Sequence, residues 1–230
     1  MKAIILAAGR GSRMKKLTEE NPKCMVFFRG KSLIDWQLEA LKGAGVNEIS
    51  IVTGYKRELL LNKKLIEFYN HRWMKTNMVK SLICADEWLM DGPCIVSYSD
   101  IFYSSEAIKL LLNSNDKLAI TFDPNWEQLW TKRFTDPLID AETFKINKDY
   151  IITEIGNKPI SLDDIQGQYM GLLKFTPASW REAKVICAQL NNIQSDKIDM
   201  TSLLQIIIHK GNISIKGIPY FEEWGEFDSA

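Results

Sequence analysis

Neither sign of charge is in excess in this sequence, because 29 Lys and Arg residues balance 29 Asp and Glu residues. A general binder of nucleic acid or of anionic membranes shows a basic excess, so no nucleic-acid partner is expected. The sequence also lacks a run of about 18 apolar residues, the length that a membrane-spanning helix needs. We therefore expect no membrane insertion.

Histidine and paired cysteine are scarce as well. The only histidines are His71 and His209, which argues against a catalytic or metal-binding histidine. The four cysteines are scattered and form no Cys-x-x-Cys pair, so a zinc site is not expected. Buried free thiols suit a reducing compartment, and the N-terminal apolar run is too short for a signal peptide. We expect a cytoplasmic protein.

The sequence does contain an alternation of strand and helix patterns. The apolar run at 2–8 ends in glycine and predicts a buried parallel strand. Helical spacing at 32–44, with Ser32 as N-cap, and an apolar strand at Glu48–Thr53 complete a βαβ unit. Further helices are expected at 58–69, 81–90, 105–113, 180–190 and 200–209, and further strands at 93–97, 117–122 and 212–218. This order predicts an α/β fold with a Rossmann-like, mostly parallel sheet flanked by helices.

The pattern changes after Asp123. Residues 126–142 are rich in Trp, Asp and Pro and have weak periodicity, and residues 143–155 hold two short strand-like pieces around a turn. We interpret residues 1–230 as a single domain in which approximately residues 123–175 form a small β-rich lid insertion.

The residues suited to chemistry begin directly after the first strand, in Leu6-Ala7-Ala8-Gly9-Arg10-Gly11-Ser12-Arg13. Gly9 and Gly11 allow backbone amides to approach a triphosphate closely. Arg13 supplies a guanidinium for phosphate oxygens, and Lys23, which follows a proline, is placed to reach the same phosphates. Neither the dinucleotide pattern Gly-x-Gly-x-x-Gly nor the Walker pattern is present, so an NAD-dependent oxidoreductase is disfavoured.

The string L-A-A-G-x-G-x-R followed by P-K resembles the signature of the sugar-nucleotide and choline-phosphate nucleotidyltransferases. The segment T-N-M-V-K-S-L at 76–82 is similar to the phosphocholine/phosphoethanolamine cytidylyltransferase-like branch of that family, of the bacterial surface-modification type. The resemblance implies a cytidylyltransferase in which Arg13 and Lys23 are catalytic. It also implies nucleotide contacts from Leu6, Ala8, Gly9, Gly11, Ser12, Asn77 and Ser81.

Two aspartates match the family's metal-binding positions. Asp100 follows the strand at 93–97, and the carboxyl end of a parallel strand faces the ligand crevice. Asp228 belongs to Glu226-Phe227-Asp228, which resembles the family's second metal-binding E-x-D. The resemblance thus implies Mg²⁺ held by Asp100 and Asp228. The chain ends at Ala230, whereas relatives usually continue into a final helix, a departure that bears on how Asp228 is positioned.

The expected reaction is in-line attack by an acceptor phosphate or phosphonate oxygen on the α-phosphorus of CTP, which releases pyrophosphate. Such an acceptor is already anionic at neutral pH, so no general base is required. The acceptors left open are phosphocholine, phosphoethanolamine, 2-aminoethylphosphonate and a phosphorylated amino acid or amide, each giving a CDP-linked product. The candidate acceptor-binding residues are Trp130, Asp140, Glu142, Gln168, Tyr169 and Trp224.

The side chains of the insertion leave two interpretations of its role open. Its aromatic residues could form a cage for a choline-like cation, or they could simply pack the lid. Its acidic residues, which include Asp140 and Glu142, suit an acceptor with an amino group. Residues 130–144 and 163–177 are similar to cytidylyltransferases that act in capsule modification.

Two other functions remain as alternatives. A sugar-1-phosphate nucleotidyltransferase shares the glycine loop but normally carries a longer sugar-binding half. A non-catalytic nucleotide-sensing regulatory subunit usually lacks the loop arginine, the lysine or one of the aspartates, and all four are present here. The resemblance also implies a homodimer.

Overall fold

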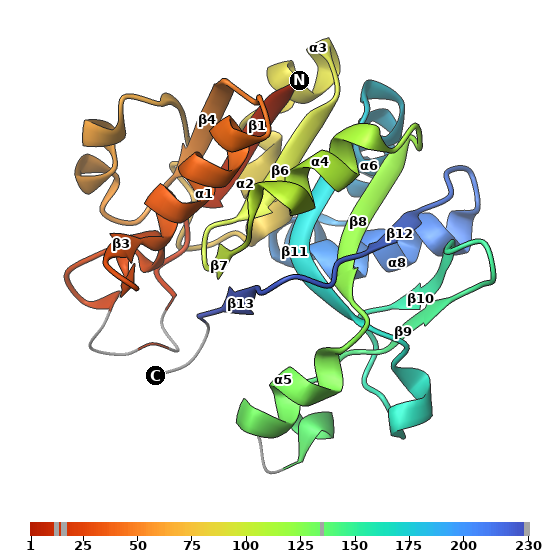
Figure 1. The fold of residues 1–230 in the computed structure, drawn as a ribbon. Coiled ribbons are helices and arrows are strands. Elements are labelled where there is room, and N and C mark those ends of the chain that lie inside the picture. The colour runs from red at the N-terminus through yellow and green to blue at the C-terminus, as the bar shows by residue number, and fades with distance from the viewer. Residues whose placement is uncertain (12–13, 15–17, 134–135, 228–230) are drawn as a thin grey trace.

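The computed structural model describes residues 1–11, 14, 18–133 and 136–227. The strands of its main sheet are β1 (Lys2–Ala7), β4 (Glu48–Thr53), β5 (Ile66–Tyr69), β6 (Cys94–Tyr98), β8 (Leu118–Asp123), β11 (Gln168–Phe175) and β12 (Lys216–Pro219). They lie in the order β12-β8-β11-β6-β1-β4-β5 (Figure 1). Short two-stranded sheets pair β2 (Phe27–Phe28) with β3 (Lys31–Ser32), β7 (Ile101–Phe102) with β13 (Gly225–Glu226), and β9 (Phe144–Ile146) with β10 (Ile152–Ile155).

Helices cover both faces of the main sheet. The helices of the described residues are α1 (Leu33–Gly43), α2 (Met78–Ile83), α3 (Asp86–Asp91), α4 (Ser105–Asn113), α5 (Trp126–Arg133), α6 (Pro177–Gln189), α7 (Asn192–Lys197) and α8 (Met200–Lys210). One apolar core lies between the sheet and α1 and α4, and the other between the sheet and α2, α3, α6 and α8. No helix in the described part of the chain is long and apolar enough to cross a membrane.

The central strand β1 shows why this arrangement forms. Successive side chains of a strand point to opposite faces, and accordingly Ile4 and Leu6 enter one core while Ala3 and Ile5 enter the other. A strand buried on both faces is the reason for the continuous apolar run in the sequence. β1 pairs in parallel with both β4 and β6, and the predicted mostly parallel Rossmann-like sheet is confirmed.

The strand order places a crevice at the carboxyl end of β1. The chain runs from β1 to β4 and β5 on one side and then crosses to β6 on the other. Ligands of open α/β sheets bind where the strand order reverses in this way, outside the carboxyl ends of the strands. The loops after β1 and β6, which carry Gly9 and Asp100, leave the sheet at this point.

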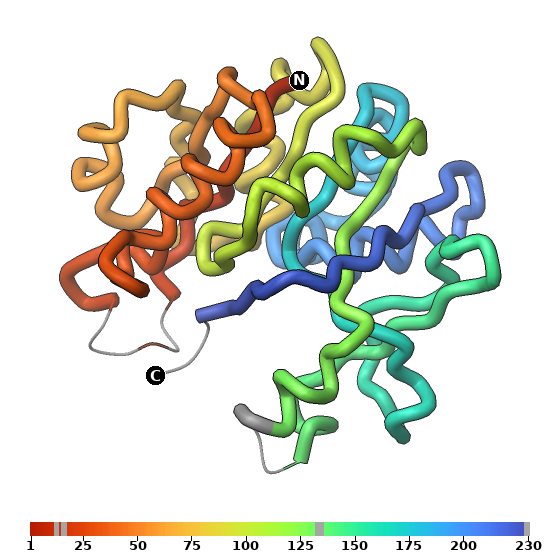
Figure 2. Tube along the Cα trace, viewed as in Figure 1, coloured from red at the N-terminus to blue at the C-terminus, as the bar shows by residue number. Residues whose placement is uncertain are grey.

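Residues of the insertion project from the same end of the sheet, where α5, β9 and β10 lie below the carboxyl end of β8 in Figure 1. The predicted strand pieces are the antiparallel pair β9 and β10. Helix α5 was not expected from the weak periodicity of its sequence. The last described segment crosses back toward the N-terminal half of the chain, as Figure 2 shows, and β13 there pairs with β7.

One helix prediction was wrong, and another predicted helix is divided in two. Residues 58–69 form two 3-10 turns and then the edge strand β5, because Lys56 and Lys64 adopt left-handed backbone angles that interrupt a helix. Residues 81–90 belong to two helices, α2 and α3, with a break before Asp86. The Asp86 carboxylate accepts a hydrogen bond from Trp180 Nε1 and pairs with Lys184, and these contacts fix the start of α3 against α6.

The structure generates a prediction at Gly171, which lies at an irregularity in the pairing of β11 with β8. Its φ is +79°, and an added Cβ would lie 2.7 Å from the Tyr98 ring. A left-handed non-glycine residue costs about 1–3 kcal/mol, and displacement of Tyr98 adds to that cost. We expect Gly171→Ala to lower the free energy of unfolding, measured by urea denaturation, by more than Gly30→Ala does.

Gly30 is the matched control because its φ is +82° and an added Cβ would have no atom within 4 Å. It isolates backbone strain from contact with a neighbour. Equal losses in the two variants would show that Tyr98 moves aside without cost.

Candidate active site

Two adjoining cavities open at the carboxyl end of the sheet. The first, the loop cavity, has a volume of about 300 Å³ and is lined by the glycine loop and by Lys23 and Asp100. The second, the acidic cavity, has a volume of about 350 Å³ and lies between the insertion and the start of α8. Asn77, Met78 and Tyr98 line both cavities, so together they form one cleft.

The loop cavity contains every described residue that was predicted to contact the nucleotide: Leu6, Ala8, Gly9, Gly11, Asn77 and Ser81. Gly11 has a φ of +68°, and an added Cβ would lie 2.9 Å from Cδ of Lys23. Glycine at this position therefore permits both the turn and the close approach of the lysine. Ser12 and Arg13, which were predicted to bind nucleotide and phosphate, lie outside the described residues.

Lys23 and Asp100 form an ion pair in the loop cavity. The Nζ atom of Lys23 lies 2.6 Å from Oδ2 of Asp100, and only 9% of the lysine side chain is exposed. Low exposure strengthens such a pair, because little water competes with it. The two residues come from the 3-10 turn Lys23–Met25 and from the loop after β6, so the ion pair joins the N-terminal segment to the centre of the sheet.

Asp100 also satisfies a first test for a metal ligand. Its Oδ1 atom is buried and accepts no hydrogen bond from the described part of the chain, so this oxygen could coordinate a hard cation such as Mg²⁺. Asp228 lies outside the described residues, but the preceding residue is held close by, since Phe227 N donates to the Asp100 carbonyl at 2.9 Å. Within the described ranges, no three His, Cys, Asp or Glu side chains cluster as a complete metal site.

Asn77 and Ser81 are both held by protein contacts at the boundary of the cleft. Asn77 caps α2 through Met78 N, and its Nδ2 donates to the Lys197 carbonyl at 3.1 Å. Ser81 Oγ accepts a hydrogen bond from Asn70 Nδ2 at 3.0 Å. These contacts fix the start of α2 beside the glycine loop, which is how a T-N-M-x-x-S-L segment contributes to the cavity wall.

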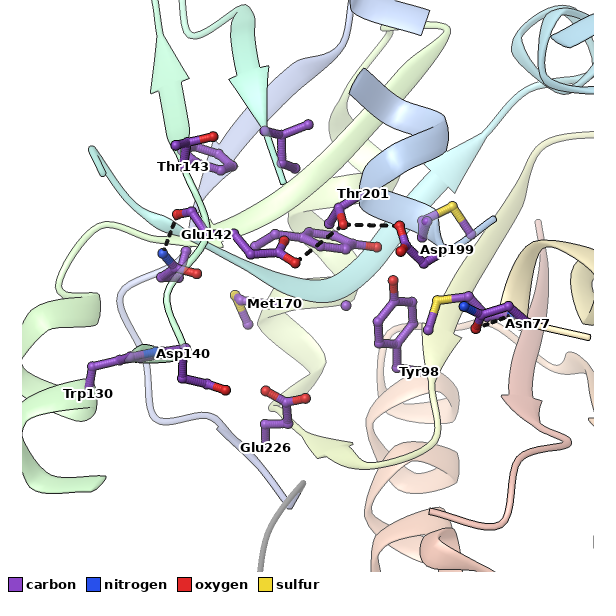
Figure 3. Close-up of a pocket in the computed structure, with 17 residues that line it drawn as sticks. Asn77, Tyr98, Trp130, Asp140, Glu142, Thr143, Met170, Asp199, Thr201 and Glu226 are labelled. Atoms are coloured by element: carbon purple, nitrogen blue, oxygen red, sulfur yellow. Dashed lines mark hydrogen bonds between the residues drawn. The ribbon is translucent and has the colours of Figure 1, made fainter. Parts of the chain in front are cut away.

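The acidic cavity has carboxylates on several sides and, among the described residues, no lysine, arginine or histidine in its lining. Figure 3 shows Asp140 and Glu226 near the C-terminal segment, and Glu142 and Asp199 across the cavity from them. Such a cavity favours a cationic group, because each carboxylate loses hydration on burial and gains from a nearby positive charge.

Glu142 and Asp199 converge on one hydroxyl group. Thr201 Oγ1 lies 3.5 Å from Oε1 of Glu142 and 3.3 Å from Oδ1 of Asp199 (Figure 3). Burial raises the pKa of the Glu142 carboxyl above its ordinary value, and the negative charge of Asp199 raises the pKa further. The protein thus holds two like charges close together where a bound cation would relieve their repulsion.

Aromatic side chains complete the cavity wall. Tyr98 and Tyr169 pack edge to face with ring centroids 5.7 Å apart, and burial raises the pKa of both hydroxyls. Trp130 also lines the cavity. Trp224 does not, because it packs behind Trp130 at 6.4 Å and donates its Nε1 hydrogen to Asp123. Its predicted contact with the acceptor therefore lacks support in this structure.

Five predicted acceptor-binding residues line the acidic cavity, namely Trp130, Asp140, Glu142, Gln168 and Tyr169. Asp199 and Thr201 also line this cavity but were not predicted from the sequence, and Glu226 was predicted only as part of the metal motif. Asp199 is the N-cap of α8 and accepts a hydrogen bond from Ser202 N. In the sequence, Asp199 therefore indicates only the start of a helix. The folded structure is needed to show that this helix begins at the cavity.

The fold is an α/β sheet with a cleft where the strand order reverses, which is the usual place for a ligand in such sheets. Residues 3–139 match the MobA-like NTP transferase domain, and the chain belongs to this family. It is therefore a nucleotidyltransferase, as the glycine loop predicted.

Related proteins of known name include cytidylyltransferases. The chain is 42% identical to a CTP:phosphoglutamine cytidylyltransferase of Campylobacter jejuni, over 99% of this chain and 96% of that protein. It is 39% identical to a choline-phosphate cytidylyltransferase of Streptococcus pneumoniae, over 39% of this chain and 46% of that protein. The fold is similar to that of an inositol-1-phosphate CTP transferase from T. maritima, with a TM-score of 0.78, 18% identity, and coverage of 99% of this chain and 89% of that one.

The pKa of Glu142 generates a prediction about stability. A carboxyl whose pKa is raised in the folded state binds more protons there than in the unfolded chain, so its contribution to stability falls as the pH rises above the ordinary value of 4.5. We expect Glu142→Gln to gain stability relative to the wild type as the pH increases from about 4.5 through the raised pKa. Thermal unfolding of both proteins across this range measures the difference.

Glu87→Gln is the control, because Glu87 is an exposed carboxylate on α3, away from the cleft. The difference between Glu142→Gln and the wild type should change with pH by more than the difference between Glu87→Gln and the wild type. Equal changes in the two differences would contradict the raised pKa of Glu142.

Proposed function

We propose that this protein transfers CMP from CTP to a glutamine that carries a phosphate group, forms a CDP-linked product and releases pyrophosphate. The observation that carries the proposal is the continuity of the loop cavity with an acidic cavity. The first suits a triphosphate, and the second suits the cationic end of an amino-acid acceptor. The relative that is 42% identical over nearly the whole of both chains is named for these two substrates.

In this reaction an oxygen of the acceptor phosphate attacks the α-phosphorus of CTP. A new phosphorus–oxygen bond forms as the bond to the β-phosphate oxygen breaks, and pyrophosphate leaves with that electron pair. The acceptor oxygen is already ionised, so the protein has no proton to remove. Catalysis then consists of positioning and of compensating negative charge.

Lys23 is the described residue best placed to compensate that charge. Its ammonium lies in the wall of the loop cavity and is held by the Asp100 carboxylate. The pair orients the ammonium in a site of low exposure, where a bound phosphate oxygen can be a second acceptor for its hydrogens. We assign Arg13 the same role on the basis of its position in the loop motif.

We propose Mg²⁺ as the cofactor, held by Oδ1 of Asp100 and by Asp228. The free oxygen of Asp100 and the hydrogen bond that brings residue 227 to its carbonyl support this assignment. The metal ion would supply positive charge at the reacting phosphate. Lys23 occupies the other carboxylate oxygen, so the ammonium and a cation would share Asp100.

The acceptor end of the site is argued from charge. The α-ammonium group of a phosphorylated glutamine would neutralise the converging carboxylates of Glu142 and Asp199. Gln168, whose Nε2 donates to the Glu142 carbonyl, lines the same cavity and can contact the amide. The aromatic rings of Trp130 and Tyr98 in the lining make phosphocholine the second candidate.

We further propose that the protein acts in the cytoplasm as a homodimer and that its product serves cell-surface modification. The similarity of residues 130–144 and 163–177 to capsule-modifying cytidylyltransferases supports the last assignment.

The role of the ion pair can be tested directly. We expect Lys23→Ala and Asp100→Asn each to lower the rate of pyrophosphate release by about 100- to 1000-fold, the effect of removing one charge-stabilising group from an active site. Lys31→Ala, which removes an exposed lysine paired with Glu39, should release pyrophosphate at the wild-type rate. Circular dichroism establishes that each variant is folded. Wild-type rates in either site variant would contradict the assignment.

The substrates can be tested with a panel. Purified protein is supplied with each of the four NTPs, with Mg²⁺ and with phosphoglutamine, phosphocholine, phosphoethanolamine, 2-aminoethylphosphonate or a sugar 1-phosphate. We expect pyrophosphate release to be fastest with CTP and phosphoglutamine. A preference for UTP or dTTP would contradict the base assignment, and a preference for a sugar 1-phosphate would contradict the acceptor class.

Asp199→Asn provides a variant within the same assay. Asparagine keeps the N-cap of α8 but removes one negative charge from the cavity. The KM for phosphoglutamine should rise about tenfold, equivalent to a loss of about 1.4 kcal/mol, while the KM for CTP stays the same. An equal rise in both KM values would indicate a general distortion of the site.

A further inference from the structure

A buried polar side chain lies on the apolar face of α1. Gln37 follows Leu33 and Ile34 at helical spacing and precedes Leu38 and Leu41, all of which are buried. Gln37 itself has no exposed surface. A glutamine buried completely in a core is costly unless its amide is hydrogen-bonded, so its contacts indicate why it is tolerated.

Both contacts of the Gln37 amide go to the loop that carries Asp100. Its Nε2 donates to the Tyr98 carbonyl at 2.8 Å and to the Ile101 carbonyl at 2.6 Å. These two carbonyls flank Ser99 and Asp100 in the sequence. One side chain thus closes the loop between β6 and β7 and fixes the distance between its two ends.

The other atom of the amide shows that this arrangement lowers stability locally. Oε1 of Gln37 is buried and accepts no hydrogen bond from the residues that the structure describes, and an unsatisfied buried acceptor is destabilising. The opposite orientation of the amide would direct its oxygen at two carbonyl oxygens, so the orientation is fixed. The two hydrogen bonds that Nε2 of Gln37 donates to the Asp100 loop therefore coexist with an unpaired Oε1 atom.

Other contacts hold the same loop. Ser97 Oγ donates to the Tyr98 carbonyl at 3.0 Å and accepts a hydrogen bond from the Tyr103 hydroxyl at 2.9 Å. Helix α1 belongs to the N-terminal segment, as Lys23 does, and Leu33 N is bonded to the Val26 carbonyl just after the Lys23 turn. Gln37 therefore ties the element that follows Lys23 to the loop that holds its partner.

We propose that Gln37 is a positioning residue that holds Asp100 in the geometry required for metal binding and for its ion pair with Lys23. This inference rests on the role proposed above for Asp100. It concerns a residue outside the cavity lining, which acts only through the backbone of the loop.

The primary test is Gln37→Met, which keeps the length of the side chain and removes both hydrogen bonds. The readout is the affinity for CTP, measured by calorimetry with Mn²⁺ and again with EDTA. Changing groups that orient a metal ligand typically costs about 10- to 100-fold in metal affinity or activity. We expect Gln37→Met to bind CTP normally in EDTA, to lose most of the gain in affinity that Mn²⁺ gives the wild type, and to lose turnover by a similar factor.

Thr121→Val is the matched control for a lost buried hydrogen bond. Thr121 has no exposed surface, and its Oγ1 donates to the Leu172 carbonyl at 3.1 Å, away from the Asp100 loop. Thr121→Val should be less stable than the wild type, but it should keep the increase in CTP affinity that Mn²⁺ gives and the wild-type rate of turnover. The proposal would be overturned if Gln37→Met and Thr121→Val lost the same share of the Mn²⁺-dependent increase in CTP affinity. It would also be overturned if Gln37→Met kept the full increase.

Gln37→Glu gives a readout that a purely structural role would not produce. A carboxylate cannot donate to the two carbonyls, whereas a protonated carboxyl can donate to one of them. Turnover of Gln37→Glu relative to the wild type should therefore rise as the pH falls, while the ratio for Gln37→Met stays flat. Parallel ratios for the two variants would overturn the proposal.

The outcomes also separate this inference from the proposed metal site. If the metal site is wrong, the wild type shows no gain with Mn²⁺ and Asp100→Asn behaves as the wild type does. If only the role of Gln37 is wrong, Asp100→Asn loses the increase in CTP affinity with Mn²⁺ and Gln37→Met keeps it.

If the Gln37 variants do not fold, Ser97→Ala is the deciding variant, because it removes the second donor to the Tyr98 carbonyl. An unchanged increase in CTP affinity with Mn²⁺ in Ser97→Ala would then overturn the proposal.

Discussion

The ion pair between Lys23 and Asp100 is the contact around which the site is organised. Two charged side chains with little exposure can lie together only if both are fixed, since either one alone would be a costly buried charge. The lysine follows the glycine loop and the aspartate follows β6, so their contact requires that both segments leave the sheet at its crevice. The parallel pairing of β1 with β6 brings these two points together.

Several local features follow from that requirement. Gly11 cannot carry a side chain, because the stem of Lys23 packs against its backbone. The Asp100 loop receives a hydrogen bond from Phe227 N, which draws the C-terminal segment across the front of the molecule. Gln37 reaches the same loop from α1. Contacts from three distant parts of the chain thus converge on the loop between β6 and β7. The Asp100 carboxylate on this loop has one oxygen without a hydrogen bond from the described residues.

The sequence allowed prediction of the features that depend on local pattern. The bounds of β4 and of α4 were correct, because a run of buried apolar residues and a helix cap are encoded by adjacent residues. Six residues of the loop cavity were also predictable, since the glycine motif and the T-N-M-x-x-S-L segment have fixed spacing, whereas Trp73 was not. Asp199 was not, because an N-cap aspartate has the same local pattern whether its helix starts at a cavity or in solvent. The strand β5 was missed because helical spacing in its sequence says nothing of the left-handed lysines that precede it.

The two cavities differ in charge, and this difference would orient the proposed acceptor, which has an anionic and a cationic end. Lysine at the loop cavity attracts phosphate, whereas Asp140, Glu142, Asp199 and Glu226 repel it from the acidic cavity. A reversed acceptor would place its phosphate among carboxylates and its ammonium beside Lys23, and both placements are unfavourable. Like-charge contacts of this kind cost several kcal/mol at an interface and select against the wrong arrangement. Burial and then the negative charge of Asp199 raise the pKa of Glu142, and an ammonium group bound in the acidic cavity would offset both effects.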